Sequence, residues 1–293
     1  AVALALERGM KGDGNQLRSL FKQYASRNPA QAMTDAKKFD GDSLVDVVRD
    51  SWADEDPAAM YDFLKETDLG LTSYQRRRAF EALGKGFAKL DPDAAMNWVH
   101  GLTQNDLSEE LHGAVIKETA RALAKTDVSK ALELLDGVEA RPGDYQGIFQ
   151  SYAETNWEEA YDAVFALEGD VQGEAAFGLL SELEGKSQEE IIQHAPSLLE
   201  MLGETTSGTL YGFLGTLDFD TVTELVEQFP ERLEASLDNW VRNTAGREDP
   251  AEVVRLIDGL PLKEREDRVK GAAIVQWAQQ EPEEAAAWAL TQP

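Results

Sequence analysis

The sequence predicts an all-α protein, an α-solenoid of about nine helix-turn-helix repeats of about 32 residues each. Three observations predict this fold class. A short phrase recurs along the chain, the apolar residues after it follow the period of a helix, and signals for strands are nearly absent. No run of alternating Val, Ile and Thr occurs, and neither does an Asn-Gly hairpin signal. We expect one array over residues 1–293.

The recurring phrase begins with an aromatic or large apolar residue, often followed by Ala. Two spacers, an Asp or Asn, often a Pro, and an Ala-rich stretch complete it. The clearest copies occupy residues 52–60, 87–96 and 277–285, and the copies at residues 187 and 218 depend more on spacing than on identity. We call the polar residue of each copy the anchor, and the nine anchors are Asn28, Asp56, Asp91, Asp127, Asn156, Ser187, Asp218, Asp249 and Glu281.

Each anchor is predicted to start a helix. Asp, Asn or Ser at an N-cap accepts hydrogen bonds from the free backbone N–H groups of the first turn. A proline directly after it occupies the first helical position, where a missing N–H costs nothing. Asn156 with Glu159 and Ser187 with Glu190 also have the spacing of a capping box.

The residues after each anchor predict an amphipathic first helix. Positions 4, 7, 8 and 11 after the anchor are mostly apolar, which matches the 3.6-residue period. Examples are Ala95, Trp98, Val99, Leu102, Ala131, Leu134, Leu135 and Val138. Trp52, Trp98, Trp277 and Trp288 are therefore expected in a repeated core. Glycines near the end of the first helix predict left-handed C-caps at Gly70, Gly101, Gly137, Gly169 and Gly259.

The second helix of each repeat is predicted to end at the next anchor, as residues 79–88 do before Asp91. The stretch from Glu281 then supplies a first helix without a second one. The chain also opens on Ala1 instead of Met. We therefore expect the array to be part of a longer chain, with the alternative that the helix from Glu281 acts as a cap.

Composition excludes several classes of protein. The chain has 55 acidic and 28 basic residues, a formal net charge of −27 and no cysteine. A disulfide scaffold, a thiolate metal site and a cysteine nucleophile are excluded. Repulsion of phosphates argues against a nucleic-acid partner. No apolar run approaches the roughly 18 residues of a membrane span.

Motifs for catalysis and cofactors are not found. The sequence has no Gly-rich phosphate loop, no HExxH and no GxSxG. His100, His112 and His194 share no metal-ligand spacing. Residues 40–43 hint at a calcium loop but lack its later Gly and Glu, so we interpret them as a loop and helix cap. We expect no catalytic residue, no cofactor and no metal.

A polar series stands six residues after the anchors, and we call it the +6 row. Equivalent positions on stacked helices lie on one surface, about 8–10 Å apart. The row is either the solvent face of amphipathic helices or a docking track for a basic or polar peptide. Its candidate partner-binding residues are Asp62, Asn97, Glu133, Asp162 and Glu224, and Gln193 and Arg255 complete it.

The only run of basic residues is Arg76-Arg77-Arg78. Such a run is most often a solvated helix face. It also has the charge to dock an acidic partner or a neighbouring Glu.

A family resemblance is visible in residues 91–98, where Pro92 is followed by Ala95 and by Trp98 six residues later. This stretch resembles the junction between tetratricopeptide (TPR) repeats. Phe63, Leu256 and Trp288 hold the place of Trp98 in other copies. The Leu-Gly and Tyr of the family's first helix are missing, and the repeat length varies. The resemblance implies a TPR-like, right-handed superhelical α-solenoid that binds proteins or peptides on its concave face.

We therefore expect a non-enzymatic scaffold that binds a protein or peptide, and a basic segment is the candidate partner of the +6 row. One alternative is an all-helical (α/α) toroid enzyme that acts on carbohydrate through an Asp/Glu pair. Another is a purely structural repeat segment of a larger envelope protein. The acidity, the absence of cysteine and the missing initiator Met favour a bacterial, periplasmic or secreted location.

Overall fold

Helices are the only regular secondary structure in the part of the chain that this computed structural model describes, which confirms the all-α prediction there. The described residues are 14–38, 42–102, 108–138, 140–202, 210–244, 249–260 and 266–291. They belong to two units, residues 1–140 (unit 1) and residues 141–293 (unit 2). Asp40 and Gly41, which belong to the possible calcium loop, lie outside the described residues.

Unit 1 alternates longer and shorter helices. Its helices are α2 (Asn15–Ala25), α3 (Pro29–Ala36), α4 (Asp42–Glu55), α5 (Pro57–Glu66), α6 (Ser73–Leu90), α7 (Pro92–Gly101), α8 (Glu109–Leu123) and α9 (Val128–Asp136).

Unit 2 continues the alternation along the chain with one exception. Its helices are α10 (Pro142–Ala153), α11 (Trp157–Val164), α12 (Gly169–Leu183), α13 (Gln188–Met201), α14 (Tyr211–Gly215), α15 (Phe219–Gln228), α16 (Pro230–Thr244), α17 (Pro250–Gly259), α18 (Glu266–Gln280) and α19 (Pro282–Ala289). The exception is α14, which has five residues and is shorter than both α13 and α15.

All nine anchors are N-cap residues, as predicted. The odd-numbered helices, from α3 to α19, each follow an anchor, and we call them anchor helices. The even-numbered helices are the return helices. Seven anchors accept a hydrogen bond from a backbone N–H of the first turn: Asn28, Asp56, Asp91, Asp127, Ser187, Asp218 and Asp249.

The two predicted capping boxes have different outcomes. At the start of α13, Ser187 and Glu190 cap each other's backbone N–H groups, which confirms that box. At α11 the prediction is wrong, because the side chain of Asn156 makes no cap hydrogen bond. Glu159 instead accepts a hydrogen bond from the hydroxyl of Tyr152 at 2.9 Å.

The predicted left-handed glycine C-caps are wrong, because the C-caps of α5 and α11 are Thr67 and Phe165, and Gly169 is the first residue of α12. Gly70 and Gly169 have positive φ angles of 57° and 59°, whereas Gly101, Gly137 and Gly259 do not. The end of α7 gives the reason. Leu102 takes an extended conformation there and its N–H bonds to the carbonyl of Val99, so the turn needs no left-handed residue.

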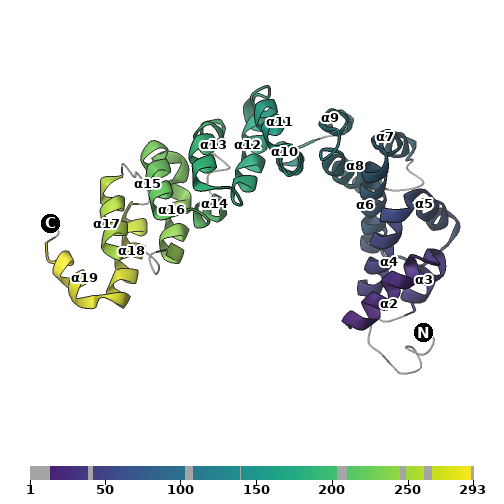
Figure 1. Ribbon diagram of the computed structural model, residues 1–293, viewed down its shortest axis with the longest axis horizontal. Helices are drawn as coiled ribbons and strands as arrows, with labels where there is room; N and C mark the ends of the chain where they lie inside the picture. Colours follow the sequence, from purple (N-terminus) through teal and green to yellow (C-terminus); the bar gives the residue numbers. More distant parts are fainter. Residues whose placement is uncertain are drawn as a thin grey trace. The chain divides into compact units, whose positions relative to one another are not determined.

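Each unit has two layers of helices (Figure 1). Successive return helices pack on one another, α2 to α4 to α6 to α8 in unit 1 and α10 to α12 to α14 to α16 to α18 in unit 2. The anchor helices cover this return layer, and α5, for example, packs on both α4 and α6. Anchor helices also touch each other at α7 with α9 and at α13 with α15.

The core lies between the two layers, and the predicted apolar positions fill it. Trp98 is 9% exposed, and its ring lies 5.1 Å from Phe87 and 6.0 Å from Tyr61 between centroids. Trp52 and Trp277 are also buried, while Trp288 is half-buried. Burial of such rings is the main source of stability for a helical layer structure.

Glycine allows the closest approaches inside the return layer. A Cβ atom added to Gly86 on α6 would lie 2.0 Å from the backbone oxygen of Ala53 on α4. A Cβ added to Gly178 on α12 would lie 2.4 Å from the backbone oxygen of Gln146 on α10. Both pairs of helices can pack this tightly because the glycines have no side chain.

Candidate functional site

The seven residues of the +6 row are all exposed. In unit 1 the row includes Asp62 on α5, Asn97 on α7 and Glu133 on α9. In unit 2 it includes Asp162 on α11 and Glu224 on α15. Gln193 on α13 and Arg255 on α17 are exposed too.

Most carboxylates of the +6 row have no internal partner. Within the described ranges, the carboxylates of Asp62, Glu133 and Asp162 take part in no hydrogen bond or ion pair. Glu224 accepts a long hydrogen bond of 3.5 Å from Gln228. These side chains are therefore available to solvent or to a binding partner.

An ion pair of Lys130 links two of the helices that carry the +6 row. Lys130 on α9 forms an ion pair of 3.0 Å with Asp93 on α7, and one of 3.1 Å with its own anchor Asp127. The helices α7 and α9 also pack on each other, so Asn97 and Glu133 belong to neighbouring helices.

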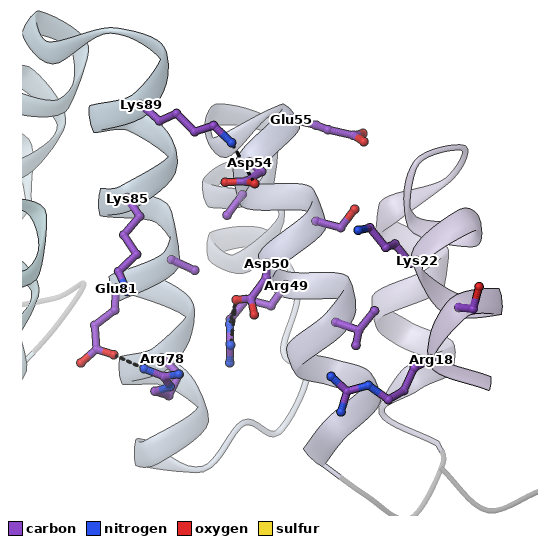
Figure 2. A pocket seen from close by; sticks show the side chains of 15 residues that line it. Arg18, Lys22, Arg49, Asp50, Asp54, Glu55, Arg78, Glu81, Lys85 and Lys89 are labelled. Atoms are coloured by element: carbon purple, nitrogen blue, oxygen red, sulfur yellow. Dashed lines mark hydrogen bonds and ion pairs between the residues drawn. The ribbon is translucent and has the colours of Figure 1, made fainter. Parts of the chain in front are cut away.

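A different surface of unit 1 is hollowed. A groove of about 800 Å³ is lined by residues of α2, α4 and α6, all of them return helices (Figure 2). We call it the return groove. It has more basic than acidic lining residues: the bases are Arg18, Lys22, Arg49, Arg78, Lys85 and Lys89, and the acids are Asp50, Asp54, Glu55 and Glu81.

Arg49 holds two acidic side chains of α4 in place. This residue is only 3% exposed, and its guanidinium pairs with both Asp46 and Asp50. Nε of Arg49 donates to Oδ1 of Asp50 at 2.8 Å. A buried guanidinium needs such partners, because an unpaired charge away from water is costly.

Ion pairs also join neighbouring return helices across the groove and beside it. Lys89 on α6 pairs with Asp54 on α4 at 3.0 Å, and Figure 2 shows this contact. Lys85 on α6 pairs with Glu118 on α8 at 2.7 Å. Burial opposes ionisation of Glu118, but Lys85 and Arg121 outweigh it, so the pKa of this carboxyl lies below its usual value.

The arginine run at the start of α6 is only partly solvated. Arg78 pairs with Glu81 at 3.1 Å, and Arg77 pairs with the same residue at 3.7 Å. The guanidinium of Arg76 lies over the ring of Phe80, 5.5 Å from its centroid. The interpretation of this run as a partner of a neighbouring Glu is correct for Arg77 and Arg78.

Two cations of α2 have no carboxylate partner in the described part of the chain. Arg18 donates a hydrogen bond of 3.3 Å to the hydroxyl of Ser43, and Lys22 has no ion pair. Both residues are exposed. Figure 2 shows their side chains extending from α2 toward α4.

Charge is unevenly divided between the two units. Residues 1–140 contain 24 acidic and 18 basic residues, whereas residues 141–293 contain 31 acidic and 10 basic residues. The return groove therefore belongs to the unit with much the smaller negative charge. Long-range repulsion of an anion is correspondingly weaker there.

Known proteins give no direct guide to function. No protein-family model, no curated protein and no solved structure matches the chain.

An aromatic cluster in unit 2 contains the one buried histidine of the described residues. His194 on α13 lies 4.7 Å from Tyr161 and 5.6 Å from Trp157 between ring centroids. Nζ of Lys186 lies over the ring of Trp157, 5.4 Å from its centroid.

Across the described residues, His, Asp and Glu form no group of three that fits a metal ion. The same part of the chain has no helix that is both long and apolar enough to cross a membrane.

The return groove was not predicted from the sequence, although a signal for it exists. Counting back six residues from successive anchors gives Lys22, Asp50, Lys85 and Arg121, and all four are exposed on return helices of unit 1. The same count in α10 gives Gln150. The positions before each anchor, and not only those after it, thus distinguish the basic face of the return helices in unit 1 from the equivalent face of α10 in unit 2.

Proposed function

We propose that the protein is a non-enzymatic scaffold, a TPR-like α-solenoid of about nine repeats, that binds a protein or peptide. The observation that carries the proposal is the exposure of all seven residues of the +6 row on successive anchor helices. A repeated, solvent-facing series of equivalent residues is the kind of surface on which repeat proteins bind extended partners.

Contacts between equivalent positions support the repeat arrangement. Asp54 and Lys89 both stand two residues before an anchor, and they form an ion pair. In unit 2, Gln150 on α10 donates a hydrogen bond of 3.0 Å to Glu182 on α12, and these residues stand six and five before their anchors. Neighbouring repeats are thus in nearly the same register at both places.

The partner's chemistry follows from the charge of the +6 row. Asp62, Glu133, Asp162 and Glu224 are carboxylates, and three of them lack any partner among the described residues. A segment rich in Lys and Arg would neutralise them. Exposed charges interact weakly one by one and are screened within about 8 Å at physiological salt. Binding must therefore use several contacts.

The test is titration of a labelled Lys/Arg-rich peptide, followed by fluorescence anisotropy at several salt concentrations. The double variant Glu133→Lys/Asp162→Lys should weaken binding by at least about ten-fold. The matched control is Asp136→Lys/Glu158→Lys, which changes the same charge on the same two helices at exposed positions outside the row. Equal loss in both variants would show that net charge, and not the +6 row, attracts the peptide.

A further inference from the structure

We infer that the return groove is a second docking site, which takes an acidic peptide segment of a protein partner. It is independent of the +6 row, because it lies on return helices and has the opposite sign of charge. Six basic and four acidic residues line it in a protein whose net charge is −27. A basic groove in so acidic a chain selects for anionic ligands.

The acids of the groove are largely neutralised within the protein. Asp50 pairs with Arg49, Asp54 with Lys89, and Glu81 with Arg78. Among the lining acids, Glu55 at the end of α4 is the one for which the described residues provide no ion pair. The carboxylates therefore do little to repel an incoming anion.

Two of the six lining bases are not neutralised, whereas Arg49, Arg78 and Lys85 form ion pairs with Asp50, Glu81 and Glu118. Arg18 and Lys22 on α2 have no carboxylate partner within the described ranges. Lys89 is held by a single ion pair in which both side chains are more than half exposed, at 62% and 56%. Exposed pairs of this kind contribute little, so Lys89 can also face a ligand carboxylate.

The spacing of the bases fits an extended peptide. Arg18 and Lys22 are four residues apart on α2, and Lys85 and Lys89 are four apart on α6. Four residues of helix rise about 6 Å. Two residues of an extended chain span about 6.6 Å. A segment with an acidic residue at every second position therefore places successive carboxylates against one such pair of bases.

The probe is a fluorescein-labelled peptide of alternating Glu and Ala, measured by anisotropy with the whole chain at low salt. A peptide with Gln in place of Glu is its neutral counterpart. We expect the Glu peptide to bind and the Gln peptide not to bind, and we expect the affinity to fall as salt rises. Failure of the Glu peptide to bind the unmodified protein overturns the inference.

The variant Arg18→Gln/Lys22→Gln should reduce affinity for the Glu peptide by about five- to ten-fold, because it removes the bases that lack partners. The matched control is Arg27→Gln/Lys125→Gln. It makes the same change of charge at exposed residues of unit 1 outside the groove and should leave affinity unchanged. Equal losses in the two variants overturn the inference, and circular dichroism checks that both are folded.

Two further measurements distinguish a peptide site in the return groove from general attraction of polyanions and from binding at the +6 row. A single-stranded oligonucleotide of equal charge should bind more weakly than the Glu peptide, and equal or tighter binding would overturn the inference of a peptide site. The variant Glu133→Lys/Asp162→Lys should still bind the Glu peptide through Arg18 and Lys22. The proposal of a binding site in the return groove and that of a binding site at the +6 row can therefore be refuted independently of each other.

Discussion

Nζ of Lys89 donates a hydrogen bond of 3.0 Å to Oδ2 of Asp54, and each of these residues stands two positions before a helix-capping Asp. The contact joins equivalent positions of α4 and α6. It shows how the repeat in the sequence becomes lateral contact in the structure: residues about one repeat apart, here 35 positions, meet across neighbouring return helices.

The variant Trp98→Ala should lower the free energy of unfolding by about 3–5 kcal/mol, the usual range for a buried Trp. The ring is enclosed by Phe87, Phe80 and Tyr61. Urea denaturation followed by circular dichroism measures the change. Trp288→Ala is the control, since Trp288 is only half-buried and should cost less. A loss below about 1 kcal/mol for Trp98→Ala would contradict its place in the core.

The variant Gly86→Ala should destabilise the protein by about 1–3 kcal/mol, because its methyl group would overlap the carbonyl of Ala53 and push α4 and α6 apart. Gly113→Ala on α8 is the control. A Cβ added there meets nothing within 4 Å, so better helix propensity should stabilise the protein by about 0.5–1 kcal/mol. Thermal unfolding should thus shift in opposite directions in the two variants, and a shared direction would argue against the close approach.

The variant Asp56→Ala should destabilise by about 1 kcal/mol, because Oδ1 of Asp56 accepts a hydrogen bond of 2.9 Å from the N–H of Ala59 at the start of α5. Asn156→Ala should cost clearly less, since the side chain of this anchor makes no cap hydrogen bond. Denaturant titration of both variants compares two anchors of the same repeat position. Equal costs would mean that the anchors act through backbone preference and not through their side chains.

Alkaline pH should destabilise unit 2 through Tyr152. Burial and the hydrogen bond to Glu159 raise the pKa of Tyr152 to about 12, whereas an unfolded tyrosine ionises near about 10. Its contribution is complete below about pH 10 and is lost as pH rises toward about 12, because the unfolded chain releases the proton first. The loss should reach up to about 1 kcal/mol, given solvent screening. Urea titrations at about pH 9 and about pH 11 should show a smaller decline in Tyr152→Phe.

The starts of the anchor helices were predictable from sequence because capping is local. Asp56, Asp91 and Ser187 carry their acceptor at the residue where the helix begins, so spacing along the chain was sufficient. Asn156 shows the limit of this reasoning. Its expected partner Glu159 is bound instead by Tyr152, a residue of the preceding return helix, and that competition depends on how α10 and α11 pack.

The return groove could not be derived in the same way. The charge that the groove presents to a ligand depends on which side chains form ion pairs between helices. Lys85 and Glu118 form such a pair, whereas Arg18 and Lys22 do not. Those pairings depend on the lateral register of neighbouring return helices. The charges at the positions before each anchor were visible in the sequence, but which of them pair with a neighbouring helix was not.

The main packing partners of each described helix are one or two places away along the chain. Such contacts are formed with little loss of chain entropy, so folding should be fast for the chain's length. A destabilising substitution in one helix should mainly affect the helices packed on it. The stability of an architecture with only neighbour contacts is close to the sum of the contributions of its units and of the interfaces between neighbouring units. One helix can therefore loosen while more distant helices stay packed, so amide hydrogen exchange should differ from helix to helix.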